Sequence, residues 1–417
     1  MKSTSAQPLN LDYVRKQFPA LQNGFVYLDN AGGSLVPQVV ADRVSEYLTN
    51  YSVQLGASYE VSAKAKDLLT EVTANLATYV NAEKPQEVIV GSSTTMLLRI
   101  LSLCISKKWR EGDEVIVTNT DHEANLTCWT DLEARGIIVK TWKANHDTLD
   151  LDLDDLQKLI TNRTKLVTIT HVSNLLGTIN PVKQIAKVVH EGGALLCVDG
   201  VAFAPHRLID VQDFEADFYV YSCYKVFGPH VGLMYGKYSL LEEMDGINHY
   251  FLKSNDIPYK FQPGNFNYEL TYGLQGVNDY LEGVHDKHYG KNTGLQSRHK
   301  YEAVFELIAA HEESLAKQLL EYLGTNPKVK LIGVPTADKQ KRVPTISFVY
   351  KDTKSPEIVK KIDPYKIGIR HGDFYAKRLA TDFGLIDHEG VVRVSVAHYN
   401  TAEEIDKLIQ AFEETLP

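Results

Sequence analysis

Residues 217–229 read Asp217-Phe218-Tyr219-Val220-Tyr221-Ser222-Cys223-Tyr224-Lys225-Val226-Phe227-Gly228-Pro229. The apolar and aromatic residues at the start of this stretch predict a buried β-strand over 217–221. Lys225 lies just beyond the strand end, among aromatic neighbours that screen it from water, and a Gly-Pro turn follows. An amine in this position readily loses its proton and can attack an aldehyde. We therefore interpret Lys225 as a candidate Schiff-base lysine.

A second apolar run, Leu195-Leu196-Cys197-Val198-Asp199-Gly200, ends in a carboxylate. A lysine and an aspartate are the minimal pair that pyridoxal phosphate requires, one to hold its aldehyde and one to keep its pyridine nitrogen protonated. Each residue also has an ordinary interpretation, because lysines near turns are usually solvated and an aspartate after a strand often caps a turn. The pair needs support from residues that bind phosphate, stack on the ring and anchor a substrate.

Strand-like and helix-like patterns alternate between residues 85 and 235, which predicts βαβ units and a mostly parallel sheet covered on both faces. In such sheets ligands bind beyond the carboxyl ends of the strands. Lys225 and Asp199 both follow strand ends. The expected strands are 87–90, 114–118, 137–141, 165–170, 194–198, 217–221 and 233–235, with helices such as 154–160 and 182–191 between them.

The C-terminal part of the chain has a different organisation. A long helical pattern over 292–323 leads to expected strands at 329–332, 343–350 and 391–396, with helices at 356–362 and 401–415. We expect a large domain over 25–290 and a smaller α+β domain formed by 1–24 and 291–417. Since no low-complexity linker separates them, the two domains should pack together.

Composition indicates an ordinary soluble globular protein, with 417 residues, of which 44% are hydrophobic and 23% charged. A net charge of −9 argues against a nucleic-acid partner. Residues 1–8 lack the apolar core of a signal peptide and no apolar run reaches membrane-spanning length, so we expect a cytosolic location and no membrane partner. The four cysteines are scattered, without a CxxC pair, which argues against disulfides and against a metal site.

Three further polar stretches follow strand ends and belong to the same expected edge. Residues 91–98 form a hydroxyl-rich turn that opens a helix, a possible anion cradle. His122 follows the 114–118 strand and can stack on a pyridine ring and move protons. Asn174 follows the 165–170 strand and offers an amide donor. Each has an ordinary turn or capping role as an alternative.

With these residues assembled, the chain resembles the class V aminotransferase group of fold-type I pyridoxal-phosphate enzymes, and most closely the cysteine-desulfurase-like branch. The resemblance spans nearly the whole length. Its motifs are Tyr27-Leu28-Asp29-Asn30-Ala31-Gly32, Asp121-His122-Glu123-Ala124-Asn125, Thr170-His171-Val172-Ser173-Asn174, Val198-Asp199-Gly200, Ser222-Cys223-Tyr224-Lys225, Phe261-Gln262-Pro263-Gly264-Asn265, Arg393-Val394-Ser395-Val396 and Tyr399-Asn400-Thr401.

The resemblance implies a role for each matched residue toward pyridoxal 5'-phosphate. Lys225 would condense with the aldehyde, Asp199 would pair with the pyridine nitrogen and His122 would stack on the ring. Asn174 would contact the phenolic oxygen. The phosphate would be held by Ser93, Thr94, Thr95, Ser222 and Tyr224, and by Asn265 from a second subunit, which implies a homodimer. Arg393 would grip the substrate's α-carboxylate, with Arg370 and Asn30 nearby.

The departures from the family decide the reaction. In its desulfurases a loop after the Arg-x-Gly turn carries a cysteine that attacks the substrate's sulfur. Here residues 370–377 read Arg370-His371-Gly372-Asp373-Phe374-Tyr375-Ala376-Lys377, and no cysteine follows Cys223. The usual glutamine after the ring aspartate is Ala202, and the usual histidine before the lysine is Tyr224.

We therefore expect a β-eliminating C–S lyase acting on cysteine or a cysteine conjugate, since elimination needs no enzyme thiol. An epimerase and a decarboxylative or carbon–carbon bond-forming enzyme are alternatives within the family. An inactive cofactor-binding scaffold is the alternative from another class.

Overall fold

A seven-stranded sheet forms the centre of the computed structural model, which describes residues 7–291 and 293–416. The strand order is β2-β8-β7-β6-β5-β3-β4. β8 runs antiparallel to β2 and β7, and the other neighbours pair in parallel. The expected α/β class and mostly parallel sheet are confirmed. The strands are β2 (Val88–Gly91), β3 (Glu114–Thr118), β4 (Ile138–Trp142), β5 (Thr164–Thr170), β6 (Leu195–Asp199), β7 (Phe218–Ser222) and β8 (Gly232–Gly236).

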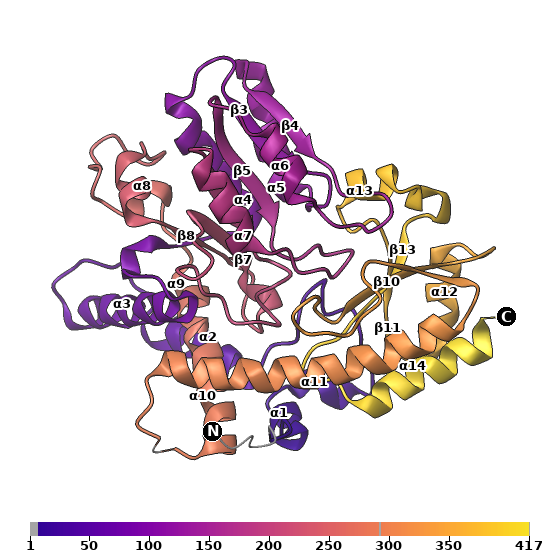
Figure 1. Cartoon of the computed structure of the whole chain (residues 1–417). Coiled ribbons are helices and arrows are strands. Elements are labelled where there is room, and N and C mark those ends of the chain that lie inside the picture. Colours follow the sequence, from indigo (N-terminus) through magenta and orange to yellow (C-terminus); the bar gives the residue numbers. More distant parts are fainter. Residues whose placement is uncertain (1–6, 292, 417) are drawn as a thin grey trace.

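Helices cover both faces of this sheet (Figure 1). Successive strand side chains point to opposite faces, so Ile89 belongs to one apolar cluster while Val88 and Val90 belong to another. Both faces are therefore buried. The helices of this region are α2 (Gln38–Asn50), α3 (Glu60–Val80), α4 (Thr94–Ile105), α5 (Ala124–Thr130), α6 (Leu153–Leu159), α7 (Val182–Glu191), α8 (Tyr238–Glu243), α9 (Tyr268–Gly273) and α10 (Gln275–Tyr289).

The C-terminal region forms a smaller antiparallel sheet in the order β12-β13-β10-β9. This agrees with the expected α+β organisation, although the short strands β11 and β12 were not expected. The elements are β9 (Val329–Ile332), β10 (Thr345–Tyr350), α12 (Ser355–Ile362), β11 (Ile367–Gly368), β12 (Arg370–Gly372), α13 (Lys377–Asp382), β13 (Val391–Ser395) and α14 (Ala402–Thr415).

The long helix α11 (Ser297–Thr325) connects the two regions (Figure 1). Val304 and Phe305, in its first half, belong to the cluster under the large sheet, whereas Leu315 and Leu319 belong to the cluster of the small sheet. The two regions share this helix, as expected for packed domains.

The N-terminal segment contacts both regions. Val14, in α1 (Leu11–Lys16), and Phe18 lie in the large cluster, whereas β1 (Val26–Tyr27) pairs in parallel with β11. The predicted domain boundaries stay a prediction: a large domain over 25–290 and a small domain formed by 1–24 and 291–417. The contacts of the N-terminal segment with both regions are the observation most relevant to these boundaries.

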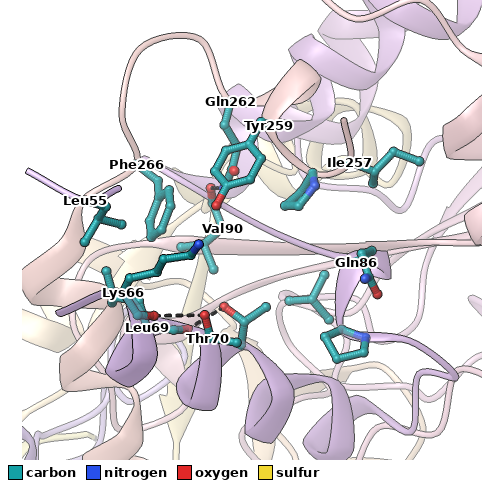
Figure 2. A pocket seen from close by; sticks show the side chains of 14 residues that line it. Leu55, Lys66, Leu69, Thr70, Gln86, Val90, Ile257, Tyr259, Gln262 and Phe266 are labelled. Atoms are coloured by element: carbon teal, nitrogen blue, oxygen red, sulfur yellow. Dashed lines mark hydrogen bonds between the residues drawn. The ribbon is translucent and has the colours of Figure 1, made fainter. Parts of the chain in front are cut away.

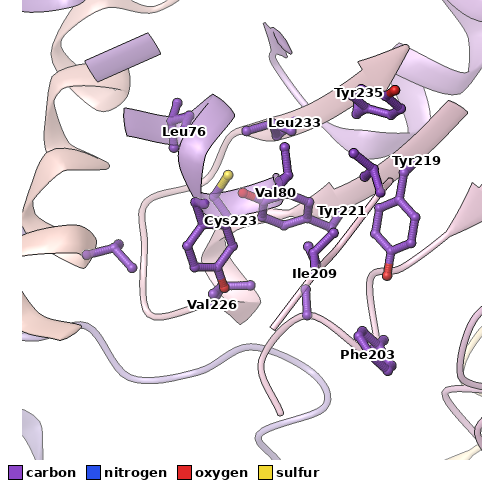
Figure 3. Close-up of a cluster of buried hydrophobic side chains, with 14 of the residues drawn as sticks. Leu76, Val80, Phe203, Ile209, Tyr219, Tyr221, Cys223, Val226, Leu233 and Tyr235 are labelled. Carbon is purple, nitrogen blue, oxygen red and sulfur yellow. The ribbon is translucent and has the colours of Figure 1, made fainter. Parts of the chain in front are cut away.

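Aromatic side chains fill the core below the end of β7 (Figure 3). Tyr219, Tyr221 and Tyr235 lie there with Leu76 and Cys223. Burial of this many apolar groups fixes the strand end that precedes Lys225. Within the described ranges, no helix combines the length and apolar content needed to cross a bilayer.

Candidate active site

A cavity of about 100 Å³ opens beyond the carboxyl ends of three central strands. Thr170, Asp199 and Ser222 are the last residues of β5, β6 and β7, and all three line it. The parallel sheet thus brings together turns that are far apart in sequence. Nine sequence-predicted residues line this cavity: Ser93, Thr94, Thr95, His122, Asn174, Asp199, Ser222, Tyr224 and Lys225.

Lys225 is the buried amine of this cavity, with 8% of its surface exposed. Its pKa is lowered to about 8, mainly by burial and also by the charges of Arg393 and Arg370, while Asp199 and Asp29 oppose the shift. At pH 7 about one molecule in ten then carries the neutral amine, against about one in three thousand for an ordinary lysine. The local environment therefore favours a nucleophilic amine.

Asp199 is also buried, at 4% exposure. Burial raises its pKa to about 6, and a hydrogen bond from the Val201 backbone N–H to Oδ1, 2.9 Å, together with nearby Lys225, opposes the rise. The carboxylate is mostly ionised at neutral pH. It fits a partner that carries a proton, as a pyridinium nitrogen does.

The backbone fixes the tautomer of His122. The Ala124 N–H donates to Nδ1 over 3.0 Å, so the proton of the neutral ring is on Nε2. Burial, with the charge of Lys225, lowers the pKa of His122 to about 4. The ring is thus neutral at working pH and suits stacking better than acid catalysis.

Hydroxyl groups and a helix N-terminus also line the cavity. Ser93 is the N-cap of α4, and its hydroxyl accepts from the Met96 N–H. The hydroxyls of Thr94 and Ser222 are 2.7 Å apart. A side chain at Gly232 would come within 2.5 Å of the Thr94 nitrogen, so only glycine permits this close packing. The unpaired N–H groups of the first helical turn suit a phosphate.

These features fit pyridoxal phosphate: an amine for its aldehyde, a carboxylate for its ring nitrogen and a cradle for its phosphate. Two buried polar atoms near the site also lack any partner, Asn174 Oδ1 and Arg393 Nε. Buried polar atoms are normally hydrogen-bonded, so these two point to a ligand.

Asn174 differs from the expected amide donor. Its Nδ2 already donates to the Phe374 carbonyl over 2.8 Å, which leaves Oδ1 for a ligand. Asn30 is fully engaged inside the protein, since its Nδ2 donates to the Tyr27 and Ser395 carbonyls and its Oδ1 accepts from Tyr399. Asn30 therefore holds its chain segment onto β13, and its role toward a substrate stays a prediction.

Two predicted arginines lie side by side. Arg370 and Arg393 are register partners on β12 and β13. Asp29 pairs with both, at 3.0 Å from Arg393 Nη2 and 3.5 Å from Arg370 Nη1. Like charges on neighbouring strands repel, and the shared carboxylate offsets that repulsion. Sequence reasoning missed Asp29, although an apolar run that ends in a carboxylate, here residues 25–29, is the signal that identified Asp199.

Phe374 and Tyr375 also lie at the site. The Phe374 ring covers the Arg393 guanidinium, and the Tyr375 ring lies 5.2 Å from that of His122. No sequence pattern predicted these contacts, because the loop backbone has an unusual left-handed conformation at both residues.

All four cysteines are buried and unpaired. Cys223 points into the apolar cluster under β7, beside Tyr221 and Val226 (Figure 3), and burial raises its pKa. None of the four lines the Lys225 cavity. The protein thus offers no thiolate there, which supports the expectation from the loop sequence.

A larger hollow of about 230 Å³ lies elsewhere, between α3 and the segment 257–266 (Figure 2). Gln262 ties this segment to β2 by donating to the Val90 carbonyl. Lys66 supplies its only ammonium group, and none of the predicted catalytic residues lines it. Nearby Asn265 is exposed and donates to Gln54. Asn265 does not line the Lys225 cavity of its own chain.

The fold and the cavity define an α/β enzyme of the fold-type I, pyridoxal-phosphate-dependent class. The chain belongs to the class V aminotransferase family, whose model, "Aminotransferase class-V", matches residues 26–408. Members of this family use pyridoxal phosphate, and the chain is an enzyme of this kind.

Relatives agree with this assignment. The chain is 40% identical to the aminotransferase-like protein FGM3 of Gibberella zeae, over 99% of this chain and all of the relative. It is 32% identical to the cysteine desulfurase-like protein ustD of Aspergillus flavus, over 95% of this chain and 88% of the relative. The crystal structure of the cysteine desulfurase CsdA of Escherichia coli matches with a TM-score of 0.83 and 25% identity, covering 98% of this chain and 99% of that one.

Proposed function

We propose that this enzyme cuts the C–S bond of cysteine or a cysteine conjugate by β-elimination. The observation that carries the proposal is the combination of one amine with a lowered pKa at the cavity and four thiols buried away from it. Elimination needs a proton acceptor and a donor but no enzyme thiol.

Arg393 is the proposed anchor of the substrate's α-carboxylate. It has 2% of its surface exposed, and its Nε has no partner in the protein. A carboxylate can take the Nε–Nη2 edge of a guanidinium with two parallel hydrogen bonds. That grip would orient the Cα–H bond of the substrate.

Lys225 is the proposed proton carrier. Bound pyridoxal phosphate supplies the electron sink that makes the α-proton acidic. Nζ removes that proton, and the ammonium then donates it to the departing sulfur, which leaves with the C–S bonding pair. The released 2-aminoacrylate hydrolyses to pyruvate and ammonia. Asp199 supports the sink through its charge, and neutral His122 excludes water from one face.

The acid–base groups favour elimination over epimerisation. Epimerisation needs proton donors on two faces, whereas the lowered pKa of His122, about 4, leaves Lys225 as the better acid and base at neutral pH. The inactive scaffold is disfavoured because Lys225 is buried in a site with unpartnered polar atoms, an arrangement that is costly without a use.

A second candidate is decarboxylative or carbon–carbon bond-forming chemistry on a dicarboxylic amino acid. The specific observation is the second guanidinium, Arg370, which is 56% exposed and shares Asp29 with Arg393. Arg370 could hold a side-chain carboxylate while Arg393 holds the α-carboxylate.

The test incubates the holoenzyme with S-phenyl-L-cysteine, L-cysteine and L-aspartate and measures thiophenol, sulfide, pyruvate, ammonia, carbon dioxide and α-deuterium exchange. Equimolar thiophenol and pyruvate from S-phenyl-L-cysteine, with equimolar sulfide and pyruvate from L-cysteine, support the lyase. If aspartate yields carbon dioxide and the two sulfur substrates yield no pyruvate, the lyase proposal is wrong and the second candidate function is supported. Exchange without any product favours the epimerase, and no reaction with any substrate favours the scaffold.

We also propose a homodimer in which Asn265 contacts the phosphate site of the partner chain. Its support is the exposed position of Asn265 outside its own cavity. The test compares the Asn265→Ala variant with the parent protein in two measurements, sedimentation for the oligomeric state and titration for cofactor affinity. We expect the variant to remain a dimer and to bind the cofactor more weakly. The unpaired state of all four cysteines suits a reducing compartment, which supports the proposed cytosolic location.

A further inference from the structure

One aromatic ring lies against the carboxylate anchor. The centroid of the Phe374 ring is 3.6 Å from Arg393 Cζ and 5.6 Å from Arg370 Cζ. Phe374 is 8% exposed and Arg393 is 2% exposed. At 3.6 Å and out of water, a guanidinium over a ring face is strongly attracted.

The backbone holds Phe374 in place from both sides. Its carbonyl accepts from Asn174 Nδ2 over 2.8 Å, and the carbonyl of Tyr375 accepts from the Glu123 N–H over 2.8 Å. Arg378 adds an ion pair to Glu123 at 3.0 Å. Phe374 and Tyr375 have φ of +53° and +60°, a conformation that residues with side chains rarely adopt. Strain that neighbours maintain in this way is commonly found at functional sites.

Two of the three guanidinium nitrogens of Arg393 donate within the protein, and the third has no partner there. Nη1 donates to the Asn174 carbonyl over 3.2 Å and Nη2 to Asp29 Oδ1 over 3.0 Å, while Nε has no partner. The Phe374 ring covers a face and prevents the guanidinium from rotating.

We propose that Phe374 is a positioning residue that orients Arg393 so that Nε and its neighbouring Nη receive the substrate's α-carboxylate. The inference rests on the proposed role of Arg393 and adds the residue that makes it effective. A leucine fills similar volume but has no π face for the cation, so ring chemistry and packing are separable.

The experiment measures binding of two small ligands to the holoenzyme by isothermal titration calorimetry. L-Alanine has an amine and a carboxylate, and ethylamine is the same molecule without the carboxylate. In Phe374→Leu we expect alanine to bind about tenfold more weakly, with ethylamine unchanged within about twofold. Phe374→Tyr keeps a π face and should bind both ligands as the parent does.

Phe383→Leu is the matched control, because Phe383 packs against the same apolar cluster as Phe374 but contacts His146 rather than an arginine. It should leave both affinities unchanged. Thermal melting of all variants identifies any that lose the fold; if Phe374→Leu does, Phe374→Met, which also fills the space without a π face, takes its place with the same expected result.

Equal weakening of alanine and ethylamine in Phe374→Leu, or equal alanine binding in Phe374→Leu and the parent, overturns the inference. The variant Arg393→Gln distinguishes a failure of this inference from a failure of the proposed function. If Arg393→Gln does not weaken alanine selectively, the carboxylate role of Arg393 is wrong; if it does while Phe374→Leu does not, only the role of Phe374 is wrong.

Discussion

The two walls of the cavity differ in how they are built. The large-sheet wall presents Lys225, Asp199 and His122 at strand ends or in short turns above a continuous core. The small-domain wall contacts the lining residues Asn174 and His122 from outside, and it presents Arg393 from a strand but Phe374 and Tyr375 from a strained loop. The first wall carries groups suited to any reaction of the family, together with the departures Ala202 and Tyr224, whereas the second carries the loop that lacks the family's cysteine. We infer that residues at the edge of the large sheet provide the reactivity toward amino acids, whereas the loop influences the choice of amino-acid substrate.

Removing the amine of the sheet wall should have the largest effect. Lys225→Ala should lower turnover by about a thousandfold or more, since positioned proton transfer contributes 10²–10⁴-fold. The measurement is pyruvate release from S-phenyl-L-cysteine at saturating substrate. Lys225→Arg, which keeps the charge but is not a base at neutral pH, should be equally inactive. Near-normal turnover in either variant would contradict the assignment.

Asp199→Ala should come next, with turnover reduced about a hundredfold, which corresponds to roughly 3 kcal/mol of lost charge stabilisation. Cofactor should still bind, because the phosphate cradle and Lys225 remain. Absorbance of the bound cofactor and single-turnover rates separate binding from reaction. A variant that reacts as fast as the parent would remove Asp199 from the mechanism.

The pH dependence tests the lowered pKa of Lys225. The rate at which apoprotein takes up pyridoxal phosphate should rise about tenfold per pH unit and level off near pH 8, because only the neutral amine attacks. Asp199 raises this pKa, so Asp199→Asn should move the midpoint downwards. Stopped-flow absorbance measures it, and a midpoint near 10.5 would show that burial does not tune this lysine.

The smallest effect should come from the loop wall. Tyr375 is 69% exposed, so Tyr375→Ala should scarcely change the melting temperature. Its ring lies beside His122 at the mouth, and losing an aromatic contact should change the kcat/KM ratio of S-phenyl- to S-methyl-L-cysteine by about fivefold. His146→Ala is the control, because His146 does not line the cavity and its ring contacts Phe383. An unchanged ratio would mean that Tyr375 does not contact the substrate.

Sequence patterns predicted the sheet wall well, for a physical reason. A buried parallel strand is a continuous apolar run, and the residue after it must lie at the carboxyl edge of the sheet. Lys225 and Asp199 were found in this way, and both line the cavity; Ser222, which also lines it, was found only through the family resemblance. Arg393 was found only through a family motif.

The loop wall could not be read in the same way. The left-handed backbone at Phe374 follows from hydrogen bonds to Asn174 and Glu123, which are distant in sequence. The internal bonding of Asn30 depends likewise on Ser395 and Tyr399. Such contacts are tertiary, and no local propensity encodes them.

The shared helix α11 has a mechanical consequence. One half of α11 packs under the large sheet and the other half packs under the small sheet. Rotation of one domain against the other would expose leucine side chains of this helix to water, so the helix resists such a motion. We expect amide exchange to report cooperative opening of both cores, so that substrate entry depends on rearrangement of side chains and loops rather than on a swinging domain.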